Sequence, residues 1–258
     1  MKIAELFSVT GKVVVITGGS RGIGEMIARA YVENGAKVYI TARSAAVCDG
    51  LAAELSKFGE CISIPADLAK MAEIERFAAE LEKRESRIDV LFNNAGASWG
   101  AGFDDFPESG WDKVMDLNVK SVFFLTQRLV KLLAAAGHAD DFARVINIGS
   151  IDGMHVSGIE TYSYAASKAG VLHLTRMMAK NLASRYIAVN AIAPGYFPSK
   201  MTAAIPEEWA AESVRQTPMK RIGNADDMGG LALYLGSKAS GFVCGSVIAV
   251  DGGYATTV

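Results

Sequence analysis

Cysteine is scarce in this chain, with Cys48, Cys61 and Cys244 the only three among 258 residues. Their odd number and wide spacing are typical neither of a disulfide framework nor of a zinc site. The chain also has only three histidines, and no two of them have the spacing of metal ligands. We therefore expect no metal site, and we expect a protein of a reducing compartment.

Long hydrophobic runs are missing as well. No stretch reaches the roughly 18 consecutive apolar residues that a transmembrane helix needs. The first twelve residues contain Glu5 and lack the apolar core and cleavage site of a signal peptide. A net charge of −2, from 26 basic and 28 acidic side chains, argues against a nucleic-acid surface driven by net charge. These absences predict a soluble cytoplasmic protein with neither a membrane nor a nucleic-acid partner.

What the chain does have is an alternation of short apolar runs and longer helix-like stretches. The runs are nearly continuous and several are rich in Val and Ile, as in parallel strands buried on both faces. They are Lys12–Thr17, Lys37–Thr41, Cys61–Pro65, Ile88–Phe92, Arg144–Ile148, Ile187–Ala193 and Val247–Val250. The helix-like stretches are Ile23–Asn34, Ala45–Phe58, Met71–Arg87, Trp111–Ala136, Tyr164–Arg185 and Ala225–Leu235. We expect residues 1–258 to form one α/β domain, with a doubly wound parallel seven-stranded sheet and helices on both faces.

A glycine-rich turn follows the first strand run. Gly18, Gly22 and Gly24 stand in the spacing G-x-x-x-G-x-G just before a predicted helix. Such a turn lets the backbone approach a pyrophosphate, which the helix N-terminus then attracts. The alternative is a packing turn whose glycines only satisfy positive φ angles.

The same turn also fits G-x-S-x-G, the nucleophile elbow of α/β-hydrolases, with Ser20 in the serine position. That interpretation needs an upstream strand and a late histidine. Only about a dozen residues precede the first strand, and the last histidine, His173, lies in the middle of a predicted helix. We therefore favour the nucleotide turn over the hydrolase.

Several further motifs follow in a fixed order. They are Asn93-Asn94-Ala95-Gly96, Asn118, Ser150, Tyr164-x-x-x-Lys168, Pro194-Gly195 and Val250-Asp251-Gly252-Gly253. Together with the glycine turn, this series resembles the short-chain dehydrogenase/reductase family over essentially the whole chain. The resemblance implies a Rossmann-type fold with strand order 3-2-1-4-5-6-7 and a catalytic set of Asn118, Ser150, Tyr164 and Lys168.

The chemistry of three of these residues can be argued directly. Tyr164 and Lys168 are four positions apart and share a helix face, so the ammonium should favour the phenolate and lower the tyrosine pKa. The pair could then exchange a proton with a substrate oxygen that Ser150 also hydrogen-bonds. The resemblance adds that Lys168 holds the nicotinamide ribose and that Asn118 supports a proton relay through water.

The end of the second strand run indicates which nicotinamide cofactor binds. It contains Arg43 and no acid before Asp49, whereas NAD specificity usually needs an acid at this place. Arg43 and Arg21 are suited to a 2′-phosphate, so we expect NADP(H). By resemblance, Asp67 bonds the adenine with Leu68 beside it. The full expected set is Gly18, Ser20, Arg21, Gly22, Ile23, Gly24, Arg43, Asp67, Leu68, Asn94, Ala95, Gly96, Tyr164, Lys168, Pro194 and Gly195.

The substrate is indicated less sharply. Residues of about 196–218 should form an apolar substrate lid, and the chain resembles the β-ketoacyl reductase branch, of the rhamnolipid-associated type. The expected substrate contacts are Ser150, His155, Tyr162, Tyr196, Phe197, Ile205 and Trp209. The expected reaction reduces a 3-oxoacyl thioester to the 3-hydroxyacyl product. Reduction of a sugar, steroid or other small ketone, or oxidation of the matching alcohol, stays open, as does a non-catalytic NADP(H)-binding sensor.

Two of the predicted helices carry more apolar residues than one core-facing stripe needs. Val122, Phe123 and Leu125 begin such a cluster in one helix, and Val171 and Leu172 begin another. Extra apolar faces usually mark subunit contacts. The resemblance implies tetramers built through these two helices and a second interface at the C-terminal strand, so we expect a homo-oligomer, either a tetramer, which is favoured, or a dimer.

Overall fold

The computed structural model of the protein describes residues 1–199 and 207–257. It contains a seven-stranded sheet of order β3-β2-β1-β4-β5-β6-β7, in which every neighbouring pair is parallel. The strands are β1 (Val13–Thr17), β2 (Lys37–Thr41), β3 (Cys61–Ser63), β4 (Val90–Asn93), β5 (Ala143–Ile148), β6 (Ile187–Pro194) and β7 (Val247–Val250). This confirms the predicted α/β fold and its strand order.

The helices follow the predicted stretches with shifted ends. They are α1 (Ile3–Leu6), α2 (Gly22–Glu33), α3 (Ala45–Leu55), α4 (Met71–Arg84), α5 (Glu108–Met115), α6 (Ser121–Ala136), α7 (Tyr162–Leu182), α8 (Glu207–Gln216) and α9 (Ala225–Gly236). The sequence does not predict α1, which is a single turn, or α8, which is short and mostly polar. No helix in the described residues is long and apolar enough to cross a membrane.

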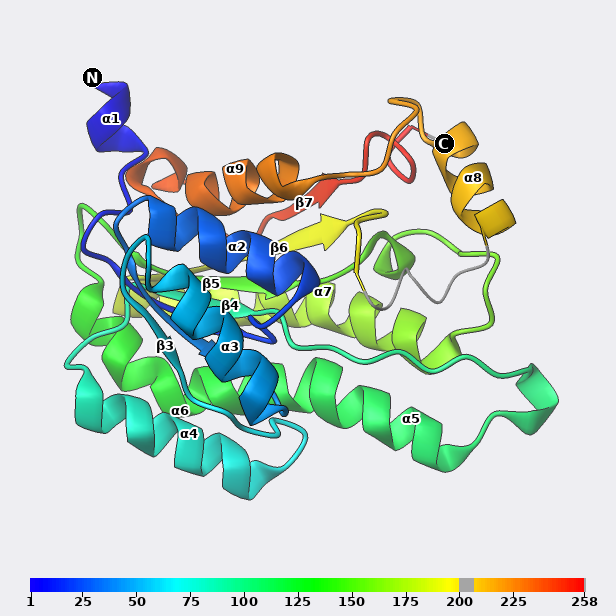
Figure 1. The fold of residues 1–258 in the computed structure, drawn as a ribbon, viewed down its shortest axis with the longest axis horizontal. Coiled ribbons are helices and arrows are strands. Elements are labelled where there is room, and N and C mark those ends of the chain that lie inside the picture. Colours follow the sequence, from blue (N-terminus) through cyan, green and yellow to red (C-terminus); the bar gives the residue numbers. More distant parts are fainter. Residues whose placement is uncertain (200–206, 258) are drawn as a thin grey trace.

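Two hydrophobic cores lie on opposite faces of the sheet. Val13 and Val15 of β1 point into the core covered by α4, α6 and α7, whereas Val14 and Ile16 point into the core of α2, α3 and α9. Figure 1 shows α2 and α9 above the sheet and α4 and α6 below it. Strands buried on both faces account for the continuous apolar runs, because neither face is left for polar side chains.

One predicted helix is interrupted. The stretch Trp111–Ala136 is divided into α5 and α6 by a π-helical turn over Asp116–Lys120. Single π turns of this kind are frequent at functional sites, and this one contains Asn118.

The apolar residues of α6 and α7 mostly face the core, which departs from the expectation of extra faces. Val122, Leu125 and Leu129 of α6 are buried, as is Val171 of α7. Phe123 and Met177 remain 39% and 51% exposed. Fewer apolar side chains are therefore left for subunit contacts than the residue count suggests, because a long helix packed on a wide sheet buries more than one narrow stripe of its surface.

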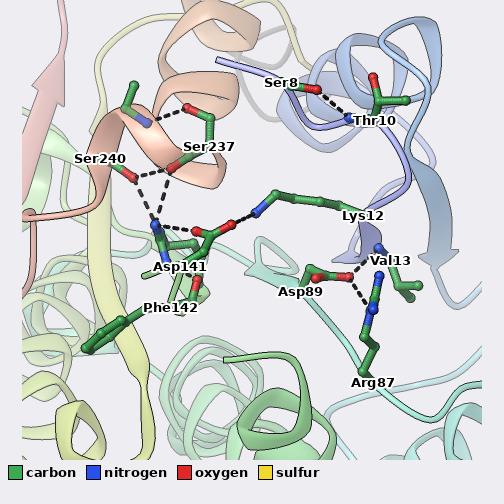
Figure 2. A network of polar contacts seen from close by, with 12 residues as sticks. Ser8, Thr10, Lys12, Val13, Arg87, Asp89, Asp141, Phe142, Ser237 and Ser240 are labelled. Atoms are coloured by element: carbon green, nitrogen blue, oxygen red, sulfur yellow. Dashed lines mark hydrogen bonds and ion pairs between the residues drawn. The ribbon is translucent and has the colours of Figure 1, made fainter. Parts of the chain in front are cut away.

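The amino-terminal edge of the sheet is closed by a polar network (Figure 2). Arg144 is 1% exposed and donates to Asp141 at 3.1 Å and to the main-chain oxygen of Phe142. Asp141 also pairs with Lys12 at 3.1 Å, and the Asp89 carboxylate accepts the N–H of Val13 at 2.8 Å. These paired charges hold the start of β1 and β5 in place. The residues predicted to bind the cofactor or to take part in catalysis lie at the opposite edge of the sheet, beyond the carboxyl ends of the strands.

Candidate active site

The glycine turn and the segment after β4 are joined by hydrogen bonds at the point where the strand order reverses. The Thr17 hydroxyl oxygen accepts the N–H groups of Asn94 and Ala95, both at 2.9 Å. The Asn94 amide donates back to the main-chain oxygens of Thr17 at 2.7 Å and Gly18 at 3.2 Å. In an open parallel sheet this reversal point forms the ligand crevice. Asn94 therefore supports the turn itself as well as lining the crevice.

Two glycines of the turn meet requirements that no other residue satisfies. Gly18 has φ +63°, which L side chains rarely adopt. A Cβ on Gly24 would lie 2.3 Å from the Gly18 oxygen and 2.5 Å from Asn94 Nδ2. Gly24 thus allows the start of α2 to pack directly on the turn, so the backbone N–H groups at the helix start remain near the crevice.

A cavity of about 650 Å³ runs along this edge. Every residue expected to bind cofactor lines it except Asp67, and Ser150 lines it as well. Asp67 lies between the lining residues Ala66 and Leu68, with its carboxylate 3.5 Å from Lys70 Nζ. The structure therefore gathers residues from the ends of β1, β2, β4, β5 and β6 around one space.

The far end of the cavity carries two arginines. Arg21 and Arg43 both line it, are exposed, and have no ion-pair partner in residues 1–199 and 207–257. Beside them the buried Thr41 hydroxyl has no hydrogen-bond partner among the described residues. Two unpaired cations and a polar atom without a partner fit an anionic, hydroxyl-rich ligand. The open glycine turn and these groups together suit a dinucleotide with an extra phosphate.

At the other end lie Ser150, Tyr164 and Lys168. Ser150 follows β5, and its Oγ accepts the N–H of Asp152 at 3.1 Å. Lys168 is 5% exposed, and its Nζ donates to the main-chain oxygen of Ile148 at 2.8 Å. The same Nζ lies 5.5 Å from the centroid of the Tyr164 ring. The predicted helix face is thus confirmed: both α7 side chains point toward the end of β5.

The pKa values in this group differ from the sequence expectation. Burial raises the pKa of Tyr164 to about 12, which outweighs the lowering effect of the hydrogen bond with Ser150. Burial lowers the pKa of Lys168 to about 8, while the Asp152 carboxylate acts in the opposite direction. The prediction that Lys168 lowers the pKa of Tyr164 is wrong for this structure, because desolvation of the phenolate dominates. Tyr164 is a protonated phenol at neutral pH and is suited to donate a proton.

Both polar atoms of the Asn118 side chain make hydrogen bonds. Its Oδ1 accepts the N–H of Ala97 at 2.8 Å, and its Nδ2 donates to the Ala97 oxygen and to Ser167 Oγ, both at 2.9 Å. The Asn118 side chain therefore ties the segment after β4 to α7. Asn118 is not among the lining residues of the cavity.

Only some of the residues predicted to contact the substrate lie at the cavity. Phe197 lines the cavity and Tyr196 precedes it. Tyr162 does not line it; its hydroxyl donates to Glu160 at 2.7 Å and its ring packs on Phe103 and Phe106. His155 does not line it either, and its ring meets that of Tyr254. Ile205 and the side chain of Trp209 lie outside the described residues.

Several lining residues were not predicted. They are Thr41, Ala42, Ser44, Val47, Ala66, Leu117, Ile148, Gly149 and Ser199. Thr41 and Ile148 end their strands and Ala66 follows one, so the rule that ligands bind beyond the carboxyl ends of strands could have found them. Leu117 lies in the π-helical turn, which has no signal in the sequence.

Comparisons with known proteins agree with this geometry. A family model described as enoyl-(acyl carrier protein) reductase matches residues 9–255. The rhamnolipids biosynthesis 3-oxoacyl-(acyl-carrier-protein) reductase of Pseudomonas aeruginosa is 47% identical over 96% of this chain and 98% of its own. The 5-keto-D-gluconate 5-reductase of Escherichia coli K12 is 36% identical over 98% and 99%. The solved Pseudomonas aeruginosa RhlG/NADP active-site complex has a TM-score of 0.93 and 46% identity, over 97% of this chain and 99% of that one. This protein belongs to the short-chain dehydrogenase/reductase family.

Proposed function

We propose that the protein is an NADPH-dependent reductase that converts a 3-oxoacyl thioester to the 3-hydroxyacyl product. One observation carries the reductase activity: Ser150, Tyr164 and Lys168 line the same cavity as the glycine turn, Arg21 and Arg43. The thioester substrate is supported by the 47% identity to a 3-oxoacyl reductase. NADP(H) is supported by the two arginines that line the cavity and by the related complex with NADP.

Each part of the site has a separate task. NADPH, when bound, supplies the hydride. Arg43, with Arg21, holds the 2′-phosphate by charge-assisted hydrogen bonds, and Gly18 and Gly24 let the backbone approach the pyrophosphate. Leu68 and Asp67 flank the adenine end. Lys168 holds the nicotinamide ribose, and Asn118 keeps the segment after β4 against α7.

The proton is delivered by Tyr164. Its phenol is neutral at physiological pH, so it donates the proton to the ketone oxygen as negative charge develops there. The Ser150 hydroxyl hydrogen-bonds the same oxygen, and its hydrogen bond with Tyr164 favours the phenolate that remains. The reverse reaction needs the phenolate, so alcohol oxidation gains rate as the pH rises.

A length series tests the substrate class. We expect NADPH consumption with acetoacetyl and longer 3-oxoacyl thioesters, with kcat/KM rising with chain length until the site is filled, because each buried methylene contributes about 0.8 kcal/mol. No turnover of any member would contradict the thioester assignment. The reductase assignment would survive if another ketone were reduced.

Reduction of a polyhydroxy ketone is the second candidate. It is favoured by the 36% identity to a 5-keto-D-gluconate reductase and by the polar residues Glu208, Glu212 and Gln216 of α8. Turnover of 5-keto-D-gluconate without turnover of any thioester would support it. Tight NADPH binding without turnover of any ketone would instead indicate a sensor.

We also propose how the chain is organised and where it acts. Residues 1–258 form one cofactor-binding domain, with a substrate lid at about 196–218, and the protein acts in the cytoplasm. The exposed Phe123 and Met177 on α6 and α7 support a homo-oligomer, a tetramer or a dimer. Sedimentation of the intact protein distinguishes these states, and a monomer would contradict the proposed assembly.

A further inference from the structure

The turn after β7 places Tyr254 between α8 and the two loops that follow β5 and β6. After β7, the Asp251 carboxylate accepts the N–H groups of Gly253 at 2.9 Å and Ala255 at 2.8 Å. The Gly252 oxygen accepts the N–H of Met219, just beyond α8, at 3.2 Å. The turn is therefore held in a defined shape against the end of α8, beside which the chain ends in Figure 1. It presents the side chain of Tyr254 inward.

Tyr254 contacts each of these segments directly. Its hydroxyl donates to Gln216 Oε1, at the end of α8, at 2.9 Å. Its ring packs edge-on against His155, with centroids 5.4 Å apart and planes at 66°. It packs in the same manner against Tyr196, at 5.4 Å and 79°. One side chain thus touches α8 and the loops that follow β5 and β6.

The two loops are those that bear the reacting end of the cavity. His155 follows the short turn Ile151–Gly153, which begins directly after Ser150, and its N–H donates to the Ile151 oxygen at 2.9 Å. Tyr196 stands between the lining residues Gly195 and Phe197. Tyr254 itself does not line the cavity, so any effect on the reaction passes through these neighbours.

The surroundings of Tyr254 keep its hydroxyl protonated, so that it can donate a hydrogen bond. Burial raises the pKa of Tyr254 to about 12, and the nearby Tyr196, Asp152 and Glu212 act in the same direction. The hydroxyl is therefore protonated across the working range of pH, and its bond to Gln216 does not titrate there. Gln216 is in turn held by Glu212, whose Oε1 accepts from Nε2 at 3.0 Å.

We propose that Tyr254 is a positioning residue for the ketone substrate, because it sets the placement of α8 and of the loops that bear His155 and Tyr196. The inference rests on the proposed ketone reduction but not on which ketone is reduced. It predicts that loss of the Tyr254 contacts affects the ketone side of the site and leaves the cofactor side unchanged. The hydrogen-bond and ring partners of the Tyr254 side chain in the described part of the chain are Gln216, His155 and Tyr196, none of which belongs to the glycine turn or to the segment that bears Arg43.

The first test compares Tyr254→Phe, Tyr254→Leu and the control Tyr186→Phe. Tyr186 is an exposed tyrosine at the start of β6, at the other edge of the sheet. We expect Tyr254→Phe to raise the KM for the ketone about 2- to 10-fold, since a neutral hydrogen bond contributes about 0.5–1.5 kcal/mol. Tyr254→Leu should raise it further, with kcat lowered less than KM is raised and the NADPH Kd within twofold of wild type. Unchanged KM in both variants, or an equal loss of NADPH affinity, would overturn the proposal.

A double-mutant cycle with Gln216→Leu isolates the hydrogen bond and does not depend on Tyr254→Leu folding. Gln216→Leu should raise the KM as Tyr254→Phe does, and the double variant should have the KM of either single variant. Additive effects would overturn the coupling. Amide exchange gives a readout independent of turnover: residues 207–216 should exchange faster in Tyr254→Phe and not in Tyr186→Phe. If the wild type reduces no ketone, the proposed function has failed, and unchanged exchange would then overturn the role of Tyr254 separately.

Discussion

The Lys168 ammonium lies over the ring of Tyr164. The Lys168 Nζ is 5.5 Å from the ring centroid and donates to the Ile148 oxygen at 2.8 Å. Lys168 is buried and Tyr164 is partly buried, and this desolvation raises the pKa of the phenol to about 12 and lowers the pKa of the ammonium to about 8. The protonated phenol therefore lies next to a lysine whose pKa is about 8. Shifted pKa values of this kind are typical of catalytic groups.

Replacing the proton donor should remove the reaction and spare the cofactor. Tyr164→Phe is expected to lower kcat at least about 100-fold, because a positioned acid contributes that much or more. The NADPH Kd, from fluorescence titration, should stay near the wild-type value. Tyr162→Phe is the control, since Tyr162 bonds Glu160 and does not line the cavity. More than about a tenth of wild-type activity in Tyr164→Phe would reject its assignment as the acid.

Cofactor preference should depend on Arg43. Arg43→Ala is expected to weaken NADPH about 10- to 150-fold and NADH much less, because a hydrogen bond to a charged group contributes about 1.5–3 kcal/mol and only NADPH carries the phosphate. Arg185→Ala, an exposed arginine outside the cavity, should change neither affinity. Titration of both cofactors measures the effect. Equal wild-type affinities for NADPH and NADH would show that Arg43 does not set the preference.

The buried lysine should make stability depend on pH with a definite sign. The pKa of Lys168 falls from 10.5 to about 8 on folding, so below pH 8 the amine is charged in both states and the folded protein bears the full desolvation cost. Between pH 8 and 10.5 the folded state releases its proton first, and this cost is relieved. The free energy of unfolding of wild type should therefore rise relative to that of Lys168→Met by about 3 kcal/mol from pH 7 to pH 10.5. Urea unfolding at both pH values measures this difference. A constant difference would mean that Lys168 keeps an ordinary pKa.

Two glycine-to-alanine changes should have different effects: Gly24→Ala should weaken NADPH binding, whereas Gly50→Ala should stabilise the folded protein. Gly24→Ala places a methyl group 2.3 Å from the Gly18 oxygen, so the turn must move and NADPH affinity should fall by at least tenfold. Gly50→Ala, in α3, meets nothing within 4 Å and should raise stability by about 0.5–1 kcal/mol without changing NADPH affinity. Thermal unfolding and cofactor titration separate the two effects. Normal NADPH binding by Gly24→Ala would argue against close packing of the turn.

The alternation of strands and helices and the glycine turn could be predicted because each is local, whereas the strand order and the expected catalytic set followed from the resemblance to a known family. A run such as Val13–Thr17 is continuous and apolar because it is buried on both sides, and the four-residue spacing of Tyr164 and Lys168 fixes a shared helix face. The ends of elements were less predictable. The sequence indicates one continuous helix where the structure has the π-helical turn at Asp116–Lys120, and α8 is too short and polar to stand out.

By itself, the sequence determined the α/β fold class and the place of the glycine turn, since these depend on short-range spacing and on the burial pattern of each strand. Only the tertiary structure decided the raised pKa of Tyr164, the use of the Asn118 side chain as a tie, and the contacts of Tyr254. The physical reason is that desolvation and hydrogen-bond partners depend on segments far apart in the chain. Gln216 and Tyr254, for example, meet at 2.9 Å although 38 residues separate them.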